Sequence, residues 1–305
     1  MLQEVVVVGY GTQKKANLTG AVATVDVNKT LDSRPIADIG RGLQGAVAGV
    51  NITIPTGEVG SDPLIKIRGQ VGSISGNNTP LILLDNVEIP SIQMVNPNDV
   101  QSISVLKDAA SSSIYGSKAA FGVILITTKS GAQSDKFEIS YSNNFSWQDP
   151  AKKIEIGGIE ALQYTLDAQT NRREPMPAGG FWRISPESLE KAIEWQNLYG
   201  GKVKWNDPVV YGRDWFYDGK DKYGYRLYDG AKAMIKNWTP TMTHNLSVNG
   251  KSGKTSYNIG LGYLDQSGMS KTAKKDDFKR YNASVSVTSE INKYITVRAS
   301  SIYSD

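Results

Sequence analysis

Hydrophobic and polar residues follow two different patterns along the chain, and the pattern changes near residue 130. Before this point, short apolar runs alternate with segments that carry helix-start and turn signals, which predicts a mixed α+β domain. After residue 135, apolar and polar residues alternate along several segments, which predicts β-strands with one apolar and one polar face. The sequence therefore predicts two regions of different architecture.

The first region combines buried-type strands with short capped helices. Pro35 opens a predicted helix that runs to about Ala48, because its fixed φ suits the first helical turn. Asn96 and Asp108 are predicted N-caps of two further short helices. The stretch 69–79 is rich in Gly, Ser and Asn and is a predicted loop. Strands are predicted where apolar runs occur, over 21–27, 50–54, 64–67, 81–84, 103–106 and 121–128.

The second region has apolar or aromatic residues at odd positions and mostly polar residues between them. Tight turns at 251–254 and 290–293 alternate with a long connection at 149–238 and a moderate one at 265–279. Alternating short and long connections are typical of an outer-membrane barrel, whose aromatic residues form interfacial girdles. The residues that define the alternation are Ile139, Tyr141, Phe145, Trp147, Tyr257, Ile259, Leu261, Tyr263, Tyr281, Ala283, Val285, Val287, Ile295, Val297 and Ala299.

The 149–238 connection carries helix signals of its own. Helices are predicted over 156–168 and 186–198, and Ser185 is the expected cap of the second helix. The connection is also rich in aromatic residues, so it is a candidate surface for capturing a ligand.

Composition excludes several classes of function. The 305 residues include no cysteine and one histidine, His244, so thiolate and histidine metal sites and a catalytic triad are not expected. The net charge of +4 is spread among acidic residues, which argues against a nucleic-acid partner. We predict no cofactor, no bound metal and no catalytic residues.

Two motifs invite other interpretations. The 250–255 segment, Gly-Lys-Ser-Gly-Lys-Thr, lacks the first glycine of a phosphate loop and lies between predicted strands, so a hairpin turn is the better prediction. The carboxylates of Asp85, Glu88, Asp99 and Asp108 could form an acid/base pair for glycoside cleavage, but nothing in their spacing requires it. We therefore predict that the protein is not an enzyme.

Several long motifs resemble one family, the SusC/RagA-like TonB-dependent outer-membrane transporters. The segments 42–52, 65–69, 96–100, 105–109, 113–120 and 122–129 are similar, in this order, to motifs of the family's plug domain. The resemblance implies an α+β plug domain followed by antiparallel strands of a transmembrane β-barrel. Because the strands predicted after the plug cannot close a barrel of about 22 strands, we expect a truncated barrel within a partial chain.

The resemblance also implies a domain organisation. Residues 1–15 are expected to be a TonB-box-like coupling segment, 16–132 the plug, and 133–305 the first barrel strands, with an extracellular loop at about 149–238. The coupling residues are Glu4, Val5, Val6, Val7, Val8 and Gly9, an exposed strand that the TonB protein could extend by strand addition.

Other site residues follow from the same resemblance. Arg68, at the end of the Ile-Arg-Gly motif, is expected to form an ion pair with acidic residues of the barrel wall, and to be unpaired where those partners are absent. The 69–79 loop is expected near the substrate through Ser73, Ser75, Asn77 and Asn78. Asn86 and Phe121 stand where the family usually has Gly and Asn, which could alter the plug surface.

The implied function is TonB-dependent import of oligosaccharides or peptides across the outer membrane of a Gram-negative bacterium. The implied partners are TonB, a SusD-like surface lipoprotein, the substrate and outer-membrane lipid. An alternative is a surface glycan-binding β protein without transport, which would need the aromatic-rich connection but no coupling segment. The identity of the substrate does not follow from the sequence.

Overall fold

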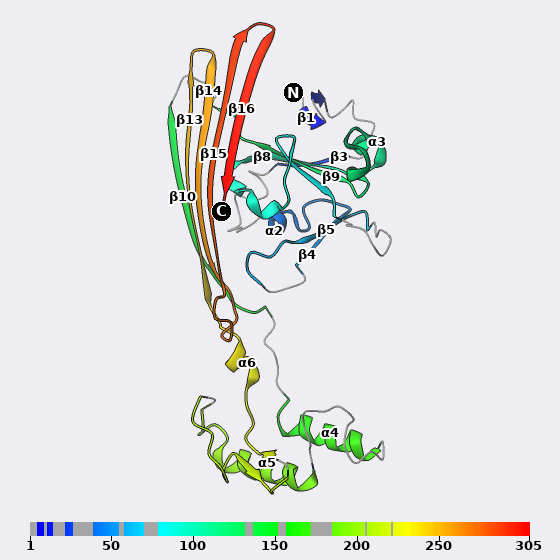
Figure 1. The fold of residues 1–305 in the computed structure, drawn as a ribbon, viewed down its shortest axis with the longest axis vertical. Coiled ribbons are helices and arrows are strands. Elements are labelled where there is room, and N and C mark those ends of the chain that lie inside the picture. Colours follow the sequence, from blue (N-terminus) through cyan, green and yellow to red (C-terminus); the bar gives the residue numbers. More distant parts are fainter. Residues whose placement is uncertain are drawn as a thin grey trace. The chain divides into compact units, whose positions relative to one another are not determined.

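The computed structural model describes residues 5–8, 11–14, 22–26, 39–54, 58–69, 79–131, 137–151, 157–171, 185–204, 206–220 and 222–305. The chain forms two compact units (Figure 1). The first contains Met1–Gln148, Trp238–Met269 and Lys275–Asp305, and the second contains Asp149–Asn237 and Ser270–Lys274. In the part of the chain that is described, no helix is both long enough and apolar enough to cross a membrane.

The first unit contains an α+β domain built on a five-stranded sheet. Its strand order is β3 (Val22–Asp26), β8 (Val100–Leu106), β9 (Val123–Thr128), β6 (Leu81–Leu84) and β7 (Val87–Glu88). β6 and β9 are parallel, and the other pairs are antiparallel. The central strands β8 and β9 have apolar residues on both faces because both faces are covered: Ile103, Val105, Val123 and Ile124 have no exposed surface.

Smaller elements surround this sheet. β1 (Val5–Val8) pairs with β2 (Gly11–Lys14), and β4 (Val50–Thr53) pairs with β5 (Leu64–Ile67). The helical segments are α2 (Ile39–Leu43), α3 (Ala109–Ser112), and the 3-10 helices η2 (Ile92–Met94), η3 (Pro97–Asp99) and η4 (Ser113–Ala119).

Local signals in the sequence account for most of these elements. The predicted caps are confirmed, because the side chain of Asn96 accepts from the backbone N–H of Asn98 and that of Asp108 from Ser111. The helix predicted to reach Ala48 is wrong in its length, since its described part ends at Leu43. Gly45, which lies inside the predicted helix, has a left-handed backbone (φ 75°), which a continuing α-helix does not allow.

The rest of the first unit is a sheet of five long antiparallel strands, which we call the long sheet. Its order is β10 (Glu138–Gln148), β13 (Thr239–Ser252), β14 (Thr255–Ser267), β15 (Asp277–Asn292) and β16 (Ile295–Ser304). The predicted hairpin at 250–255 is confirmed: Ser252 pairs with Thr255, and Gly253 (φ 56°) makes the turn.

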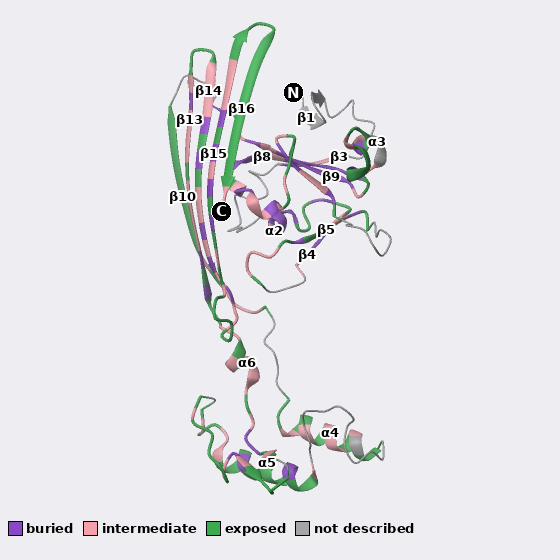
Figure 2. Cartoon of the chain, viewed as in Figure 1, coloured by how far each residue is buried: buried purple, intermediate pink, exposed green. Residues whose placement is uncertain are grey.

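Burial in the long sheet is inverted relative to a water-soluble sheet. Along β15, Arg280, Asn282, Ser284 and Ser286 are buried, whereas Tyr281 and Val285 are exposed. Figure 2 shows the buried positions of the long sheet concentrated on its three central strands, β13, β14 and β15. The alternation predicted from the sequence is therefore present, with its polar face turned to the α+β domain.

The second unit covers most of the connection predicted to be a long loop. It contains α4 (Ile159–Asn171), α5 (Pro186–Tyr199), α6 (Gly230–Met234) and a hairpin of β11 (Trp215–Tyr217) and β12 (Lys222–Gly224). The prediction that Ser185 caps α5 is confirmed, because Ser185 and Ser188 form a reciprocal capping box. The connection is thus a folded unit, with Leu189, Ala192 and Trp195 of α5 in its core.

Candidate functional site

The outer face of the long sheet carries a row of aromatic rings. His244 on β13 lies opposite Tyr263 on β14, which lies opposite Tyr281 on β15. The rings of Tyr263 and Tyr281 are 5.0 Å apart between centroids, and the hydroxyl of Tyr141 lies 2.7 Å from His244 Nδ1. His244 therefore belongs to an aromatic row. Among the described residues, no group of three His, Asp or Glu side chains is arranged to hold a metal.

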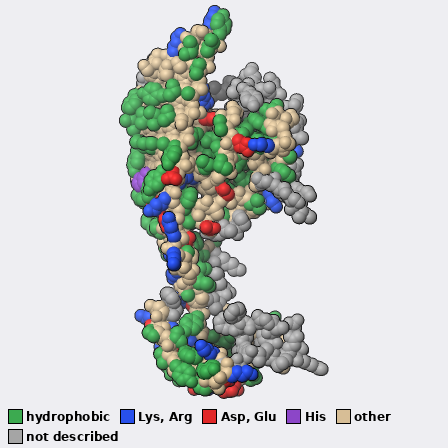
Figure 3. All heavy atoms as spheres, in the orientation of Figure 1, with side chains coloured by type: hydrophobic (Ala, Val, Ile, Leu, Met, Phe, Trp, Pro, Cys, Tyr) green, Lys and Arg blue, Asp and Glu red, His purple; other side chains and the backbone are tan. Residues whose placement is uncertain are grey.

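Exposed apolar side chains surround this row (Figure 3). An apolar outer band with aromatic rows near its edge is the arrangement of a sheet that faces lipid. The strongly exposed residues are Ile139, Tyr141, Phe145, Trp147, Ile259, Leu261, Tyr281, Val285, Val297 and Tyr303.

The inner face of the long sheet is bound to the α+β domain by polar contacts. The side chains of Asn96, Asp99, Arg280, Asn282 and Ser284 are buried and hydrogen-bonded in these contacts, which offsets the cost of removing them from water. The contacts join Asn96 Nδ2 to Asn245 Oδ1 (2.9 Å), Arg280 Nη1 to Gln93 O (2.6 Å), Asn282 Nδ2 to Met94 O (2.9 Å) and Ser284 Oγ to Asp99 Oδ2 (2.8 Å). We call this set of contacts the polar seam.

Asp99 is the carboxylate at the centre of the polar seam. It is 7% exposed, and burial raises its pKa above the ordinary value for aspartate. The hydrogen bond from Ser284 and the charges of Lys129 and Arg280 act in the opposite direction but are weaker. Asp99 therefore occupies a site that favours the neutral acid more than water does.

A second contact between the α+β domain and the long sheet is an ion pair. Asp85 Oδ2 lies 3.6 Å from Arg298 Nη2 on β16, and the same carboxylate accepts from the N–H and hydroxyl of Thr128. Asp85 and Asn86 both have positive φ, 45° and 70°, in the turn between β6 and β7. The acidic partner thus comes from the α+β domain and the arginine from the long sheet.

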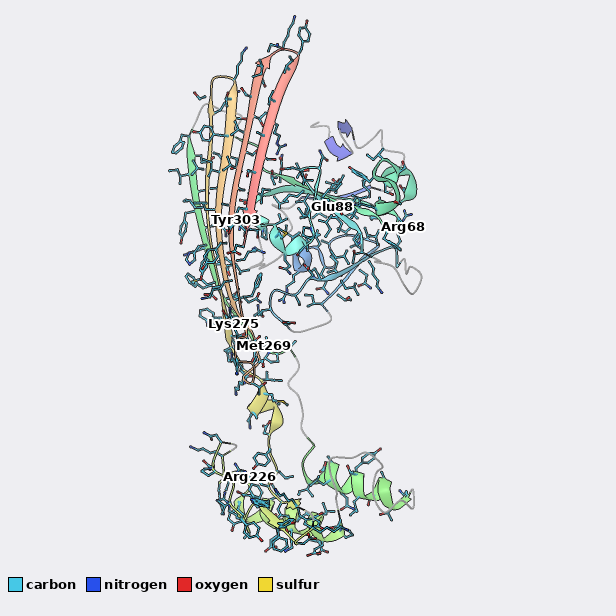
Figure 4. The ribbon with its side chains drawn as sticks, in the orientation of Figure 1. Arg68, Glu88, Arg226, Met269, Lys275 and Tyr303 are labelled. Atoms are coloured by element: carbon cyan, nitrogen blue, oxygen red, sulfur yellow. The ribbon has the colours of Figure 1, made fainter. Side chains whose placement is uncertain are left out.

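Arg68, the arginine predicted to pair with the barrel wall, is not part of this ion pair. It follows β5 with φ 54°, and its N–H donates to Gly49 O (2.7 Å). Its side chain is exposed and has no acidic partner among the described residues. Figure 4 shows Arg68 at the side of the α+β domain away from Tyr303 on β16.

The other predicted acid/base candidates are engaged in separate structural contacts. Asp108 caps α3, and Glu88 forms an exposed ion pair with Lys118 at 2.6 Å. The structure thus assigns each carboxylate its own contact.

The predicted coupling and loop residues are described only in part. Val5–Val8 form β1, a strand whose only described neighbour is β2. Glu4 and Gly9, and the loop residues Ser73, Ser75, Asn77 and Asn78, lie outside the described residues.

A cavity of about 550 Å³ opens in the α+β domain beside Thr79, the last residue of the 69–79 loop. Its wall combines carboxylate, hydroxyl and ammonium groups with prolines and an aromatic ring, so it can both hydrogen-bond a ligand and pack against it. The lining includes Asp62, Thr79, Glu88, Ser91, Lys118 and Phe121. Asp62 accepts a hydrogen bond from the hydroxyl of Ser91.

The second unit contains a buried ionic network that the sequence did not reveal. The Asp214 carboxylate accepts from Trp195 Nε1 (2.9 Å), from Arg213 Nη2 (2.7 Å) and from the N–H of Val210 (2.8 Å). Arg226, labelled in Figure 4, completes the network with its Nη1 3.5 Å from Asp214 Oδ2. Arg213 holds the pKa of Asp214 far below the ordinary range, against the opposing effect of burial.

Comparisons with known proteins agree with this architecture. Residues 14–123 match the TonB-dependent Receptor Plug Domain family. The chain is 32% identical over 279 residues to the TonB-dependent receptor P26 of Formosa agariphila, covering 89% of this chain and 24% of that protein. It is 28% identical over 296 residues to the TonB-dependent receptor SusC of Bacteroides thetaiotaomicron, covering 94% of this chain and 24% of SusC. The chain thus spans about a quarter of the length of the curated relatives it matches.

Comparison with solved structures points to the same family of receptors. The RagAB peptide importer in its open-open state is similar with a TM-score of 0.73 and 30% identity, over 99% of this chain and 32% of that one. The α+β domain is therefore a plug domain, and the long sheet corresponds to the N-terminal part of a receptor barrel. The chain belongs to the SusC/RagA-type TonB-dependent receptors, which are non-enzymatic proteins of the Gram-negative outer membrane.

Proposed function

We propose that this protein imports oligosaccharides or peptides across the outer membrane by TonB-dependent transport. The observation that carries the proposal is a plug domain held by the polar face of a sheet whose opposite face is apolar. Such an arrangement closes the lumen of a lipid-embedded barrel until the plug is remodelled. The long connection 149–238 is then the extracellular loop, and 133–305 supplies barrel strands.

TonB would act through the N-terminal segment, Glu4 to Gly9. One edge of β1 is occupied by β2. No other described strand pairs with β1, so a partner strand could add to its second edge. Strand addition uses backbone hydrogen bonds and requires little sequence specificity. The unpaired edge of β1 supports a coupling segment in residues 1–15. The family match over residues 14–123 supports a plug in 16–132.

The substrate would meet the plug at the cavity beside the 69–79 loop, where Ser73, Ser75, Asn77 and Asn78 are proposed contacts. The similar RagAB is a peptide importer and the similar SusC is a TonB-dependent receptor, which supports a polymer fragment as substrate. The two-component RagAB also supports a SusD-like lipoprotein as the partner that covers the outer side.

Arg68 would fasten the plug on the side away from the long sheet. Its exposed guanidinium can pair with a carboxylate in another part of the receptor. In the full-length receptor, Arg68→Ala is expected to raise sensitivity to large antibiotics. If antibiotic exclusion and uptake are both unchanged, Arg68 does not fasten the plug.

The proposal is tested by deleting Glu4–Val8 from the full-length receptor in its host. Uptake of labelled peptides and oligosaccharides should be lost, while binding of the same substrate at the cell surface remains. Replacing Lys293 and Tyr294, in the exposed turn between β15 and β16, by alanines is the control outside the coupling segment and should leave uptake intact. Uptake that survives the deletion shows that TonB does not act through this segment.

The substrate class can be tested at the cavity. Phe121→Asn removes the aromatic wall and restores the residue that the family usually has. We expect this change to alter the relative uptake of different substrates, whereas Tyr294→Asn, on an exposed turn of the long sheet, should not.

A surface glycan-binding function without transport is the second candidate. It is favoured by one observation: in the second unit, Tyr211 stacks on Phe216 with centroids 6.0 Å apart, and both rings are strongly exposed. Exposed aromatic rings with fixed geometry suit ligand capture. If this were the whole function, deleting Glu4–Val8 would leave the biological activity intact.

A further inference from the structure

The outer face of the long sheet is hollowed at Ala283. Leu261 of β14 and Tyr303 of β16 pair with Ala283 from either side, and their strands are about 10 Å apart. Because Ala283 offers only a methyl group between these larger side chains, a depression of about 410 Å³ remains, which we call the Ala283 depression. Other side chains in its wall are Tyr141, His244, Leu246, Tyr263 and Tyr281.

The Ala283 depression is apolar and open. Tyr281 and Tyr303 on its wall are 50% and 60% exposed, an arrangement that is unfavourable in water and favourable against hydrocarbon. The long sheet corresponds to part of the barrel of an outer-membrane receptor, so its apolar outer face meets lipid. The depression therefore fits a hydrocarbon chain better than it fits a polar ligand.

A pair of opposite charges lies on the same face, nearer the ends of the strands. Asp265 of β14 is paired with Lys279 of β15, two residues along from the paired Tyr263 and Tyr281. Side chains two residues apart in a strand share a face, so the charges and the depression are on one surface. The hydroxyl of Tyr263 donates to Asp265 Oδ2 (3.0 Å), which joins the wall of the depression to the charge pair.

This charge pair has hydrogen-bonding capacity to spare. Lys279 Nζ lies 3.6 Å from Asp265 Oδ2, which is an ion-pair distance but too long for a good hydrogen bond. Within the described residues, Lys279 Nζ makes no hydrogen bond, although an ammonium has three N–H donors. The side chains of Lys279 and Asp265 are 48% and 28% exposed, so a ligand can reach both.

The combination of charges selects a class of lipid headgroup. A lysine alone would favour an anionic headgroup, because basic side chains are attracted to anionic lipid surfaces. The Asp265 carboxylate beside Lys279 offsets this preference, and it can accept from a primary ammonium. A headgroup that carries both a phosphate and an ammonium therefore complements the pair.

The spacing along β15 also suits a lipid. Lys279 and Ala283 are four residues apart, which is about 13 Å along a strand. This length leaves room for the glycerol and ester groups that separate the headgroup of a phospholipid from its acyl chains.

We propose that the outer face of the long sheet binds one molecule of phosphatidylethanolamine. One acyl chain lies in the Ala283 depression, the phosphate accepts from Lys279, and the ammonium donates to Asp265. The site is on the face of the sheet opposite the plug, so it is separate from the cavity proposed for the substrate. The inference rests on membership of the outer-membrane receptors and is independent of the proposed import function.

Native mass spectrometry of the full-length receptor tests the choice of headgroup. The purified receptor is mixed with micelles that contain equal amounts of phosphatidylethanolamine and phosphatidylglycerol with the same acyl chains. Lipid that stays bound after removal of detergent is identified by its mass. We expect one phosphatidylethanolamine to be retained in preference to phosphatidylglycerol. Equal retention, or preference for phosphatidylglycerol, would overturn the proposal.

Variants of the charge pair test which group meets each part of the headgroup. Asp265→Asn should shift the preference severalfold towards phosphatidylglycerol, since Lys279 then acts alone. Lys279→Gln should lower the retention of both lipids. Glu290→Gln, a carboxylate near the other end of β15, is the matched control and should keep the wild-type preference. Unchanged retention in the two charge-pair variants would show that the pair does not contact the headgroup.

Filling the depression tests the contact with the acyl chain. Ala283→Phe should lower the retention of phosphatidylethanolamine severalfold, whereas Ala299→Phe, on the same face of β16 but outside the depression, should not. If Ala283→Phe assembles poorly, Ala283→Leu fills part of the same space. Equal retention in the variants at both positions would overturn the proposal. So would a loss of dimers in Ala283→Phe with lipid retention unchanged, because the face would then be an interface between copies.

Discussion

Asp99 in the first unit and Asp214 in the second are both buried aspartates, yet their surroundings have opposite effects on their pKa. Asp214 receives two arginines, an indole N–H and a backbone N–H, and its pKa is held far below the ordinary range. Asp99 has one hydroxyl donor and more distant cations, and burial raises its pKa. The number and charge of direct donors, more than burial itself, decide which form of a buried carboxyl is favoured.

The comparison also separates two uses of a buried acid. The Asp214 network holds together α5, β11 and the segment around Arg226, so it stabilises one folded unit from within. Asp99 joins two structures, the plug and the long sheet, through the hydrogen bond that it accepts from Ser284 Oγ. The following predictions test this contrast, beginning with the largest expected effect.

Asp214→Asn should strongly destabilise the second unit. The substitution removes the negative charge between Arg213 and Arg226, and loss of one partner from a buried ion pair typically costs about 3–5 kcal/mol. Hydrogen exchange of the α5 amides in the intact receptor should accelerate accordingly. Asp218→Asn, in the exposed β11–β12 turn, is the control and should leave those amides unchanged. Equal effects of the two variants would contradict the role assigned to the network.

The two units should respond to pH in opposite directions. The lowered pKa of Asp214 gives stability that is present above the unfolded aspartate value, about 3.9, and is lost as pH falls towards the folded value. The raised pKa of Asp99 gives stability that is complete below about 3.9 and is lost as pH rises through the folded value. Hydrogen exchange in α5 and β8, corrected for intrinsic rates, measures both. Parallel pH profiles would contradict the comparison.

Arg298→Ala should have a small effect on plug attachment. Arg298 is 38% exposed on its side chain, and exposed ion pairs contribute about 0.2–1 kcal/mol. The thermal midpoint of the receptor in detergent should shift slightly, and less at high salt, where screening already weakens the pair with Asp85. Arg298→Lys is the control that keeps the charge. A loss as large as that of Asp214→Asn would show that this ion pair, more than the polar seam, holds the plug to the long sheet.

Asp99→Asn should be close to neutral near pH 7. The site already disfavours the ionised acid relative to water, and the asparagine oxygen can still accept from Ser284. We therefore expect little change in the thermal midpoint of the receptor. Asp99→Leu, which removes the acceptor and adds bulk beside Gly260, is the contrasting variant. Strong destabilisation by asparagine would mean that the charge itself holds this contact.

The local features of this fold could be predicted from the sequence because they depend on neighbours along the chain. Asn96, Asp108 and Ser185 cap the segments that follow them, and the odd-even alternation of the long strands sets which residues share a face. The family motifs of the plug likewise identify its strands. The helix predicted from Pro35 ends before Ala48 because Gly45 has a left-handed backbone, which follows from the whole fold.

Contacts between distant segments were decided only by the tertiary structure. The sequence predicted a plug–wall ion pair at Arg68, which stays a prediction, but it did not reveal the described pair between Asp85 and Arg298, 213 residues along the chain from Asp85. The Asp214 network has no sequence signature, since Trp195, Arg213 and Arg226 become neighbours only on folding. The alternation places Gly260 and Gly262 on the inner face, but only the fold shows that a Cβ atom there would overlap Asp99 and Ser284 in one case and Asn96 in the other. Charge, hydrogen bonding and space at these sites depend on partners that sequence proximity does not supply.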